Sequence, residues 1–244
     1  MHTWARYLIF FQYIGTKYNG AVKVPAHQLG KRGIQDHLEE AIMRLKPVNP
    51  VSLSVSSRTD TGVHALSNSA HFDLQRKNNK PPFTEQTLVE ALNFHLRSEQ
   101  IRITHAHRVP NTFHARFSAE SRTYIYRIAL GIPHYSLLPL TENNLCWSLW
   151  NTHIPIWELT FRSRSFLYRQ VRRMTGALVA VGQGRMSVSQ LKDLLEAQDS
   201  LAYPQGLVAP ARGLFLTKVD YKDTDLQPFQ TPEAQHPSTG DSED

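Results

Sequence analysis

Two hydrophobic periods alternate along the chain, and together they predict a mixture of strands and helices. Apolar and polar residues alternate with a period of two, which is typical of half-buried strands, in residues 51–56, 70–74, 101–109 and 157–161. Residues 6–14, 121–130 and 214–221 are rich in apolar and aromatic side chains, and we expect strands there as well. Apolar residues recur at steps of three or four, the spacing of an amphipathic helix, in residues 33–45, 84–96, 166–181 and 187–197. Ser187 and Gln190 form a capping box that predicts the start of the last helix.

These elements follow one another without a regular strand–helix–strand repeat. This order favours an α+β fold with a mostly antiparallel sheet flanked by helices. We expect an N-terminal α+β domain over residues 1–115 and a C-terminal α+β domain over residues 116–222. Residues 223–244 are acidic and have few apolar side chains, which predicts a disordered tail.

The helix predicted over residues 166–181 combines an apolar stripe with a cluster of arginines. The stripe consists of residues at steps of three or four: Leu167, Val171, Met174, Leu178 and Val181. The first turns of the helix contain three arginines: Arg169, Arg172 and Arg173. The helix dipole disfavours exposed cations at this end by roughly 0.3–1 kcal/mol each. The cluster therefore indicates anionic groups nearby, although a solvated helix face is the simpler alternative.

The C-terminal residues differ in charge from the rest of the chain. From Asp220 onward there are seven acidic residues and one basic residue, Lys222, so this stretch carries a net charge of −6. Because the whole chain carries +6, residues 1–219 carry +12. A basic globular part suits a polyanionic partner such as RNA, through phosphate contacts and counterion release. It is also compatible with a basic surface that binds no partner.

Several other classes of protein are disfavoured. No apolar run is long enough to span a bilayer, so we expect no membrane span. The N-terminal apolar run lacks a following small-residue cleavage site, so we expect a strand there and an intracellular protein, cytoplasmic or mitochondrial. The single cysteine, Cys146, excludes an internal disulfide and a cysteine-rich metal site. The histidines show no spacing typical of metal ligands, and we expect no metal.

The first candidate for chemistry is a turn that follows the strand at residues 51–56. Residues 56–64 read Ser-Ser-Arg-Thr-Asp-Thr-Gly-Val-His, which places Asp60 in a glycine-containing turn at the end of a strand. A rigid strand that presents a carboxylate at its end is a good platform for catalysis. Aspartate, threonine and glycine are also ordinary turn residues, so the turn by itself is more simply explained by structure.

The triplet from Asp60 to Gly62 also occurs in aspartic proteases. Those enzymes need two such aspartates that share one proton. This chain has one copy, so it would have to dimerise. In addition, Arg58 lies two positions away and would hold the aspartate in its charged form, which a proton-sharing pair cannot use. The sequence therefore disfavours a protease.

A second candidate is the strand at residues 121–130, in which aromatic and basic residues alternate. Arg122, Tyr124, Tyr126 and Arg127 follow a segment, Phe113–Ser118, that contains Arg116. Such alternation suits the stacking of a base and the binding of phosphates. The alternative is a half-buried strand whose tyrosines pack in the core.

Together, these segments resemble the tRNA pseudouridine synthase A family. The Arg-Thr-Asp-x-Gly-Val-His run at 58–64 has the same residues as the family's catalytic motif. The segments 113–116, 122–126, 166–172 and 213–216 match further motifs in the same order. Within the family, residues 56–60 and 165–174 are most similar to the branch named pseudouridine synthase-like 1. The resemblance covers roughly residues 6–221 and implies the pseudouridine synthase fold.

The resemblance implies a role for each matching residue. Asp60 is implied to be the nucleophile that attacks a target uridine, at the base or at the sugar carbon. Arg172 is implied to pair with Asp60 and keep it charged, and Arg58 to help hold the target nucleotide out of the stack. The remaining implied contacts are stacking by Tyr124, apolar walls from Val171 and Leu214, substrate binding by Arg116, and RNA-backbone contacts by Arg122, Arg169 and Arg173.

The implied reaction converts uridine to pseudouridine in tRNA, with no redox change and therefore no cofactor. The family also implies a homodimer. The chain departs from the family between Trp147 and Trp157, where relatives have several tens of additional residues, so we expect an internally shortened second domain. This departure leaves a second function open: an RNA-binding protein that retains the basic cleft but has impaired catalysis.

Overall fold

The computed structural model describes residues 4–24, 30–131, 138–139, 142–149, 156–199, 201–204 and 206–227. Within these residues one eight-stranded sheet has the order β4-β1-β3-β8-β5-β6, with β2 beside β3 and β7 beside β5. The strands are β1 (Trp4–Tyr13), β2 (Ser54–Val55), β3 (His64–Gln75), β4 (Ile101–Val109), β5 (Ser121–Leu130), β6 (Trp147–Leu149), β7 (Ile156–Ser163) and β8 (Leu214–Asp220). Among the described pairs, β3–β8 and β5–β6 are parallel and the others antiparallel, which confirms the α+β fold with a mostly antiparallel sheet.

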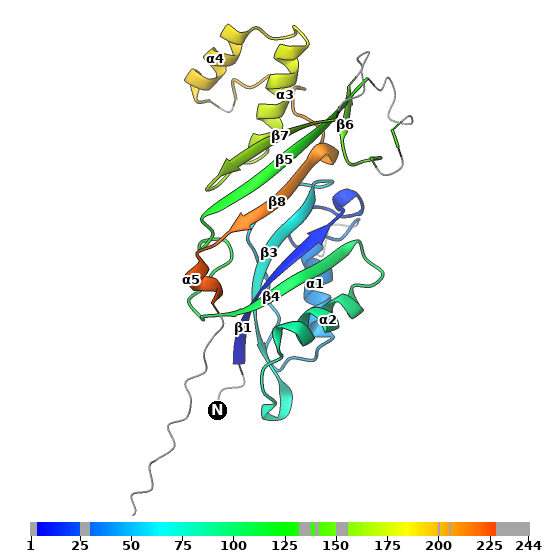
Figure 1. The fold of residues 1–244 in the computed structure, drawn as a ribbon, viewed down its shortest axis with the longest axis vertical. Helices are drawn as coiled ribbons and strands as arrows, with labels where there is room; N and C mark the ends of the chain where they lie inside the picture. The colour runs from blue at the N-terminus through cyan, green and yellow to red at the C-terminus, as the bar shows by residue number, and fades with distance from the viewer. Residues whose placement is uncertain are drawn as a thin grey trace, which may run out of the picture.

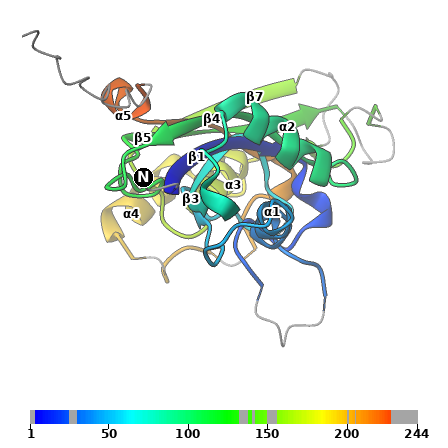
Figure 2. The ribbon, with the colours of Figure 1, turned by 90° about the horizontal axis from the view of Figure 1, so that it is seen from below.

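Five α-helices accompany this sheet among the described residues. They are α1 (Ile34–Met43), α2 (Glu85–His95), α3 (Gln170–Gly182), α4 (Val188–Ala197) and α5 (Asp223–Leu226). Helices α1 and α2 lie near β1, β3 and β4, whereas α3 and α4 lie at the opposite end, near β5 and β7 (Figure 1). Seen along the sheet, α1 and α3 lie on the same side of it (Figure 2).

The parallel pairing of β3 with β8 joins the two halves of the chain in one sheet. His64 at the start of β3 lies opposite Phe215 in β8, and Leu216 in β8 lies opposite Tyr124 in β5. The turn that carries Asp60 immediately precedes β3. The sheet therefore places this turn beside the first residues of β8 and close to the middle of β5.

Helix α3 differs from its prediction in its start and in part of its buried face. It begins at Gln170, because Arg169 adopts a left-handed conformation with φ 56° and cannot continue a helix backwards. The predicted apolar stripe is confirmed at Val171, which is buried, and at Met174 and Val181, which pack against buried clusters. It is wrong at Leu167, which is 78% exposed, and at Leu178, which is 46% exposed.

Small residues form much of the buried face of α3. Its buried residues are Val171, Thr175, Gly176, Ala177, Val179 and Ala180. A Cβ at Gly176 would lie 1.5 Å from the carbonyl oxygen of Leu207, so glycine permits the close approach of that loop. Hydropathy spacing weights large side chains, so it missed the contribution of these small residues to the buried face.

Three other segments differ from their predictions. Strand β3 begins at His64, six residues before the run at 70–74 that predicted it. Of the strand expected at residues 51–56, only Ser54 and Val55 pair, with His71 and Ala70. The first residues of the expected tail form α5, and residues 228–244 lie outside the described residues. Residues 150–155, where the chain is expected to be shortened, also lie outside them.

Candidate active site

The turn that carries Asp60 is held by hydrogen bonds from both sides. The amide of Val63 donates to the Asp60 carbonyl at 3.2 Å, and Gly62 has φ +78°, a conformation that glycine adopts without strain. The hydroxyl groups of Thr59 and the buried Tyr13 lie 2.7 Å apart in a hydrogen bond. Thr59 thus ties the residue before the carboxylate to the core of β1.

A second loop packs against the same turn. The Ala21 amide donates to the Thr59 carbonyl at 3.0 Å, and the Thr61 hydroxyl donates to Asn19 Oδ1 at 2.7 Å. A Cβ at Gly20 would lie 2.7 Å from the Thr59 carbonyl oxygen, so a side chain there would push the loops apart. The Asp60 backbone is therefore fixed by two loops rather than by its own turn alone.

His64 anchors the end of the turn and does not face the cavity. Its Nδ1 accepts from the Gly15 amide at 3.0 Å, so Nε2 carries the proton that is donated to the Asn144 carbonyl at 3.0 Å. Its ring is fully buried and stacks on Phe215, with centroids 4.7 Å apart. Burial lowers the pKa of His64, which favours the neutral ring that these contacts require.

Asp60 forms an ion pair with Arg172 across 112 residues of sequence. Arg172 Nη1 lies 2.8 Å from Asp60 Oδ2, and Arg172 Nε donates to the Ala209 carbonyl at 2.7 Å. Arg169 Nε is 3.9 Å from the same carboxylate oxygen. The arginines at the start of α3 were predicted to lie near anionic groups, and Asp60 is one such group.

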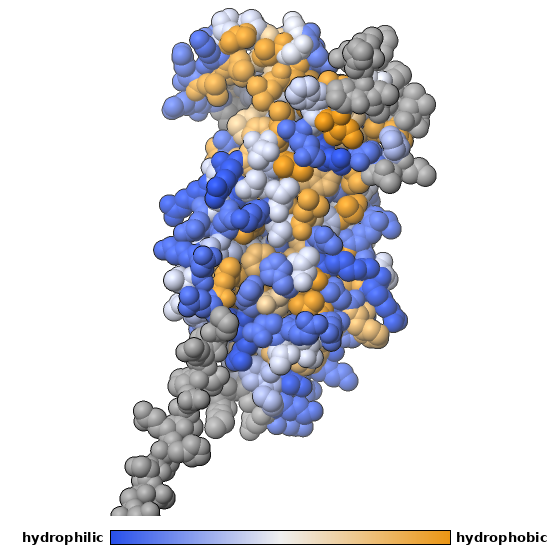
Figure 3. Space-filling model, in the orientation of Figure 1, coloured by the Kyte–Doolittle hydropathy of each residue, from blue (hydrophilic) through white to orange (hydrophobic). Residues whose placement is uncertain are grey.

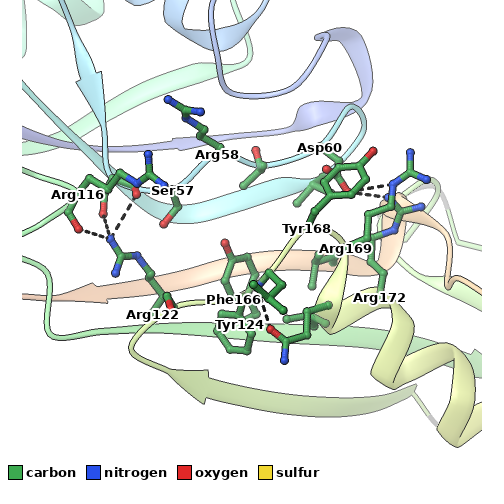
Figure 4. A pocket seen from close by; sticks show the side chains of 18 of the residues that line it. Ser57, Arg58, Asp60, Arg116, Arg122, Tyr124, Phe166, Tyr168, Arg169 and Arg172 are labelled. Atoms are coloured by element: carbon green, nitrogen blue, oxygen red, sulfur yellow. Dashed lines mark hydrogen bonds and ion pairs between the residues drawn. The ribbon is translucent and has the colours of Figure 1, made fainter. Parts of the chain in front are cut away.

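Tyr124 lies in β5 and borders the same cavity. The Phe166 ring meets it edge-on, with centroids 5.3 Å apart, as Figure 4 shows. Burial raises the pKa of Tyr124 to about 12, so its hydroxyl is neutral at physiological pH. The ring is thus a rigid, uncharged surface on which a planar group can stack.

The cavity beside Asp60 has a volume of about 580 Å³. Its lining includes nine of the residues that the sequence predicted for a site: Arg58, Asp60, Arg116, Arg122, Tyr124, Arg169, Val171, Arg172 and Leu214. Arg58 points away from the pair formed by Asp60 and Arg172 (Figure 4). Among the described residues, Asp60 is the only acidic residue in this lining.

Two of the predicted arginines occupy other environments. Arg122 is buried, and its guanidinium donates to the carbonyls of Arg116 and Arg164 at 2.7 Å and to that of Ser56 at 3.3 Å. It holds three segments of the cavity wall together. Arg173 does not line the cavity, and its guanidinium lies 5.6 Å from the centre of the Tyr203 ring.

Sequence reasoning assigned no role to several aromatic and basic residues of the lining, namely Phe117, Arg164, Phe166 and Tyr168. Tyr168 lies against Arg169, whose guanidinium is 4.8 Å from the ring centre. Three of these residues, Arg164, Phe166 and Tyr168, lie in the non-helical segment before α3. The sequence predicted a helix from residue 166, so the aromatic residues of this segment were assigned to a helix.

Neither of two common kinds of arrangement, a metal-binding cluster and a membrane-spanning helix, is found among the described residues. Among the described residues, no group of three or more histidine, cysteine, aspartate or glutamate side chains is arranged to hold a metal ion. Likewise, none of the described helices combines the length and apolar character needed to cross a bilayer.

Comparison with known proteins gives consistent matches. A family described as tRNA pseudouridine synthase matches residues 9–118 and 137–222. The chain is 43% identical over 288 residues to "tRNA pseudouridine synthase-like 1" of Xenopus laevis, covering 95% of this chain and 96% of the relative. It is 44% identical to the Homo sapiens protein of the same name, covering 89% and 90%. It is 33% identical to "tRNA pseudouridine synthase A" of Hyphomonas neptunium, covering 88% and 98%.

The lengths of these matches show that the chain is internally shorter than its relatives. Ninety-five per cent of 244 residues is about 232, so about 56 of the 288 positions matched to the Xenopus protein have no residue of this chain opposite them. This difference supports the expected shortening. Its placement between Trp147 and Trp157 stays a prediction.

Proposed function

Because the chain belongs to the tRNA pseudouridine synthase family, we propose that it isomerises uridine to pseudouridine in tRNA, with Asp60 as covalent nucleophile. The observation that carries this proposal is the contact of 2.8 Å between Arg172 Nη1 and Asp60 Oδ2 in a cavity that Tyr124 also lines. A charged carboxylate beside a stacking surface is what an attack on a nucleoside requires.

In the first step, the target uridine leaves the RNA stack and enters the cavity. Extrusion of a base costs a few kcal/mol, and stacking on an aromatic ring offsets roughly 1–3 kcal/mol of this cost. Tyr124 supplies the stacking surface, and Val171 and Leu214 supply apolar walls. Arg58 at the mouth of the cavity helps keep the nucleotide extruded.

In the second step, a carboxylate oxygen of Asp60 attacks the base or the sugar carbon, and the glycosidic bond between C1′ and N1 breaks. The uracil turns and rejoins through a bond between C1′ and C5. The proton on C5 is lost, N1 gains a proton, and Asp60 is released. The proton from C5 passes to water and water supplies the proton to N1, so atoms and electrons balance without a redox change.

Arg172 positions the nucleophile in this scheme. Its Nε is fixed by the Ala209 carbonyl, so Nη1 meets the carboxylate at one defined angle. Tyr124 is assigned stacking first, because a phenol with a pKa of about 12 is almost entirely neutral at pH 7. Help from its oxygen in removing the C5 proton would require a partner that accepts that proton.

The direct test uses tRNA carrying tritium at uracil C5, because loss of the C5 proton releases the label. We expect release by the natural chain and none by Asp60→Asn. Asp193→Asn, which changes an exposed aspartate on α4, is the matched control and should release tritium at the natural rate. Equal release by the Asp60→Asn and Asp193→Asn variants would exclude Asp60 as the nucleophile.

A second candidate function is RNA binding without catalysis. The observation that favours it is the set of about 56 matched positions at which this chain has no residue. The same assay separates the two functions: tRNA binding without tritium release by the natural chain would support the binding protein and contradict the isomerase.

A further inference from the structure

Phe117 is a large aromatic residue on the surface, next to the cavity of Asp60. Its side chain is 73% exposed, although it lies in the short connection between β4 and β5. It lines the 580 Å³ cavity and also a second hollow of about 470 Å³. The two hollows share Arg58, Arg116 and Phe117, so these residues form the ridge between them.

The local backbone holds the Phe117 ring in a defined position. The Phe117 amide donates to the His114 carbonyl at 3.0 Å, and the Ser118 amide donates to the same carbonyl at 2.8 Å. The His114 ring packs against one side of Phe117, with centroids 4.4 Å apart. A ring that is already ordered loses little entropy when another planar group stacks on it.

Cations lie on the side of this ring that faces the second hollow, whereas a third hollow that Phe117 also lines contains Glu120 and Asp225. The Arg116 guanidinium lies 5.7 Å from the ring centre. The second hollow is lined by Lys23, Arg58 and Arg116 and, among the described residues, by no acidic side chain. An exposed aromatic ring among cations is the arrangement with which proteins bind single-stranded nucleic acid, because bases stack on the ring and cations contact the phosphates.

We propose that Phe117 stacks on a base that flanks the extruded uridine, and that the second hollow receives the adjoining RNA backbone. This inference rests on the proposed function, since it takes the 580 Å³ cavity as the site of the target nucleotide. The flanking nucleotide is then the next group along the RNA. A ridge shared by both hollows places Phe117 where the RNA chain must pass.

The test measures the affinity of unmodified tRNA transcripts by fluorescence anisotropy at several salt concentrations, in the Asp60→Asn background. This background makes the measurement independent of turnover. Phe117→Ala is expected to weaken binding about 5- to 150-fold, the range that corresponds to roughly 1–3 kcal/mol per stacked base. The slope of log affinity against log salt should stay unchanged, because no phosphate contact is removed.

Three further variants distinguish aromatic stacking from a simple loss of apolar bulk. Phe117→Trp should restore binding, whereas Phe117→Leu, which keeps apolar bulk without an aromatic face, should bind as weakly as Phe117→Ala. Phe94→Ala is the matched control, because Phe94 is 61% exposed, has Arg97 4.9 Å from its ring centre and lines neither hollow. It should bind as the parent does.

The proposal is overturned if Phe117→Ala binds as tightly as Phe94→Ala, or if Phe117→Leu binds as tightly as the parent. It is also overturned if Phe117→Trp fails to restore binding. If the stacking pattern is found but the natural chain releases no tritium from uracil C5, the proposed isomerase fails while the stacking site stands. If the parent binds no tRNA, both fail.

Discussion

At the scale of single residues, the site depends on the geometry of one guanidinium. Arg172 uses Nε for the Ala209 carbonyl and Nη1 for Asp60, so two hydrogen bonds in one plane fix its position. Lysine has a point charge and no planar fork, and it cannot make both bonds in this arrangement. Charge alone therefore does not account for the choice of arginine.

We predict that Arg172→Lys retains tRNA binding but lowers the single-turnover rate of tritium release about 100-fold. The reason is that a displacement of about 1 Å in a reacting constellation costs about that factor. The matched control is Arg44→Lys, which alters an exposed arginine–carboxylate pair with Glu40 on α1 and should leave the rate unchanged. A rate for Arg172→Lys within a few-fold of the natural chain would contradict the positioning role.

The same residue scale explains what sequence alone could supply for the site. Asp60, Gly62 and His64 lie within five residues of one another, so the sequence alone identifies their motif. The pairing of Asp60 with Arg172 spans 112 residues, and no local pattern encodes it. It was expected only from the family resemblance. Phe117 received no role, because exposure of an aromatic residue cannot be read from periodicity.

At the scale of elements, α1, α2, α4, β4 and β5 were predicted within about two residues at each end, whereas β2, β3 and the start of α3 were not. The limits of β4 and β5 agree with their alternation, since both strands have one face against the core. The start of α3 was wrong by four residues, because Arg169 takes a left-handed conformation beside Asp60. A tertiary contact thus overrode a good helical pattern.

Strand β3 contains a histidine whose titration should report on the stability of the connection before β5. His71 Nδ1 accepts from the Ala115 amide at 3.1 Å, so the ring must be neutral there. Burial, together with the nearby His114, lowers the pKa of His71 to about 4. A lowered histidine pKa means that the unfolded chain binds the proton first as pH falls.

We therefore predict that the free energy of unfolding decreases as pH falls from about 6.5 to about 4, by up to about 3 kcal/mol from this group. Urea unfolding of the natural chain and of His71→Gln at pH 7.5, 5.5 and 4.5 measures it. The variant should lose less stability on acidification than the natural chain. Equal losses in the two proteins would show that His71 does not contribute.

At the scale of the whole molecule, the end formed by β7, α3 and α4 exposes apolar side chains. Figure 3 shows apolar surface gathered around α3 and α4. The large exposed residues of this part of the described chain are Ile156, Trp157, Leu178, Val188, Leu195 and Leu201. Within the region aligned to this chain, the Xenopus relative has about 56 positions at which this chain has no residue. If those positions lie between Trp147 and Trp157, as the sequence predicts, they precede β7 directly, and we expect them to cover this surface.

We predict that inserting the internal segment of the Xenopus relative between Trp147 and Trp157 raises the melting temperature by at least about 3 °C. Trp157 is 58% exposed, and burying one large apolar side chain contributes about 1.5–3 kcal/mol. In a chain of this size, 1 kcal/mol corresponds to about 2–4 °C. Circular dichroism melts of both chains measure the two melting temperatures. An unchanged or lower melting temperature after the insertion would contradict the expectation that the segment covers this apolar surface.

The central claim is that this shortened chain still brings Asp60 and Arg172 together on a uridine. The most direct measurement incubates the chain with a pool of unmodified tRNA transcripts, digests the RNA to nucleosides and quantifies pseudouridine by chromatography with mass spectrometry. The natural chain is predicted to form pseudouridine, and Asp60→Asn is predicted to form none. Pseudouridine formed by Asp60→Asn, or its absence with the natural chain when the chain binds the transcripts, would contradict the account.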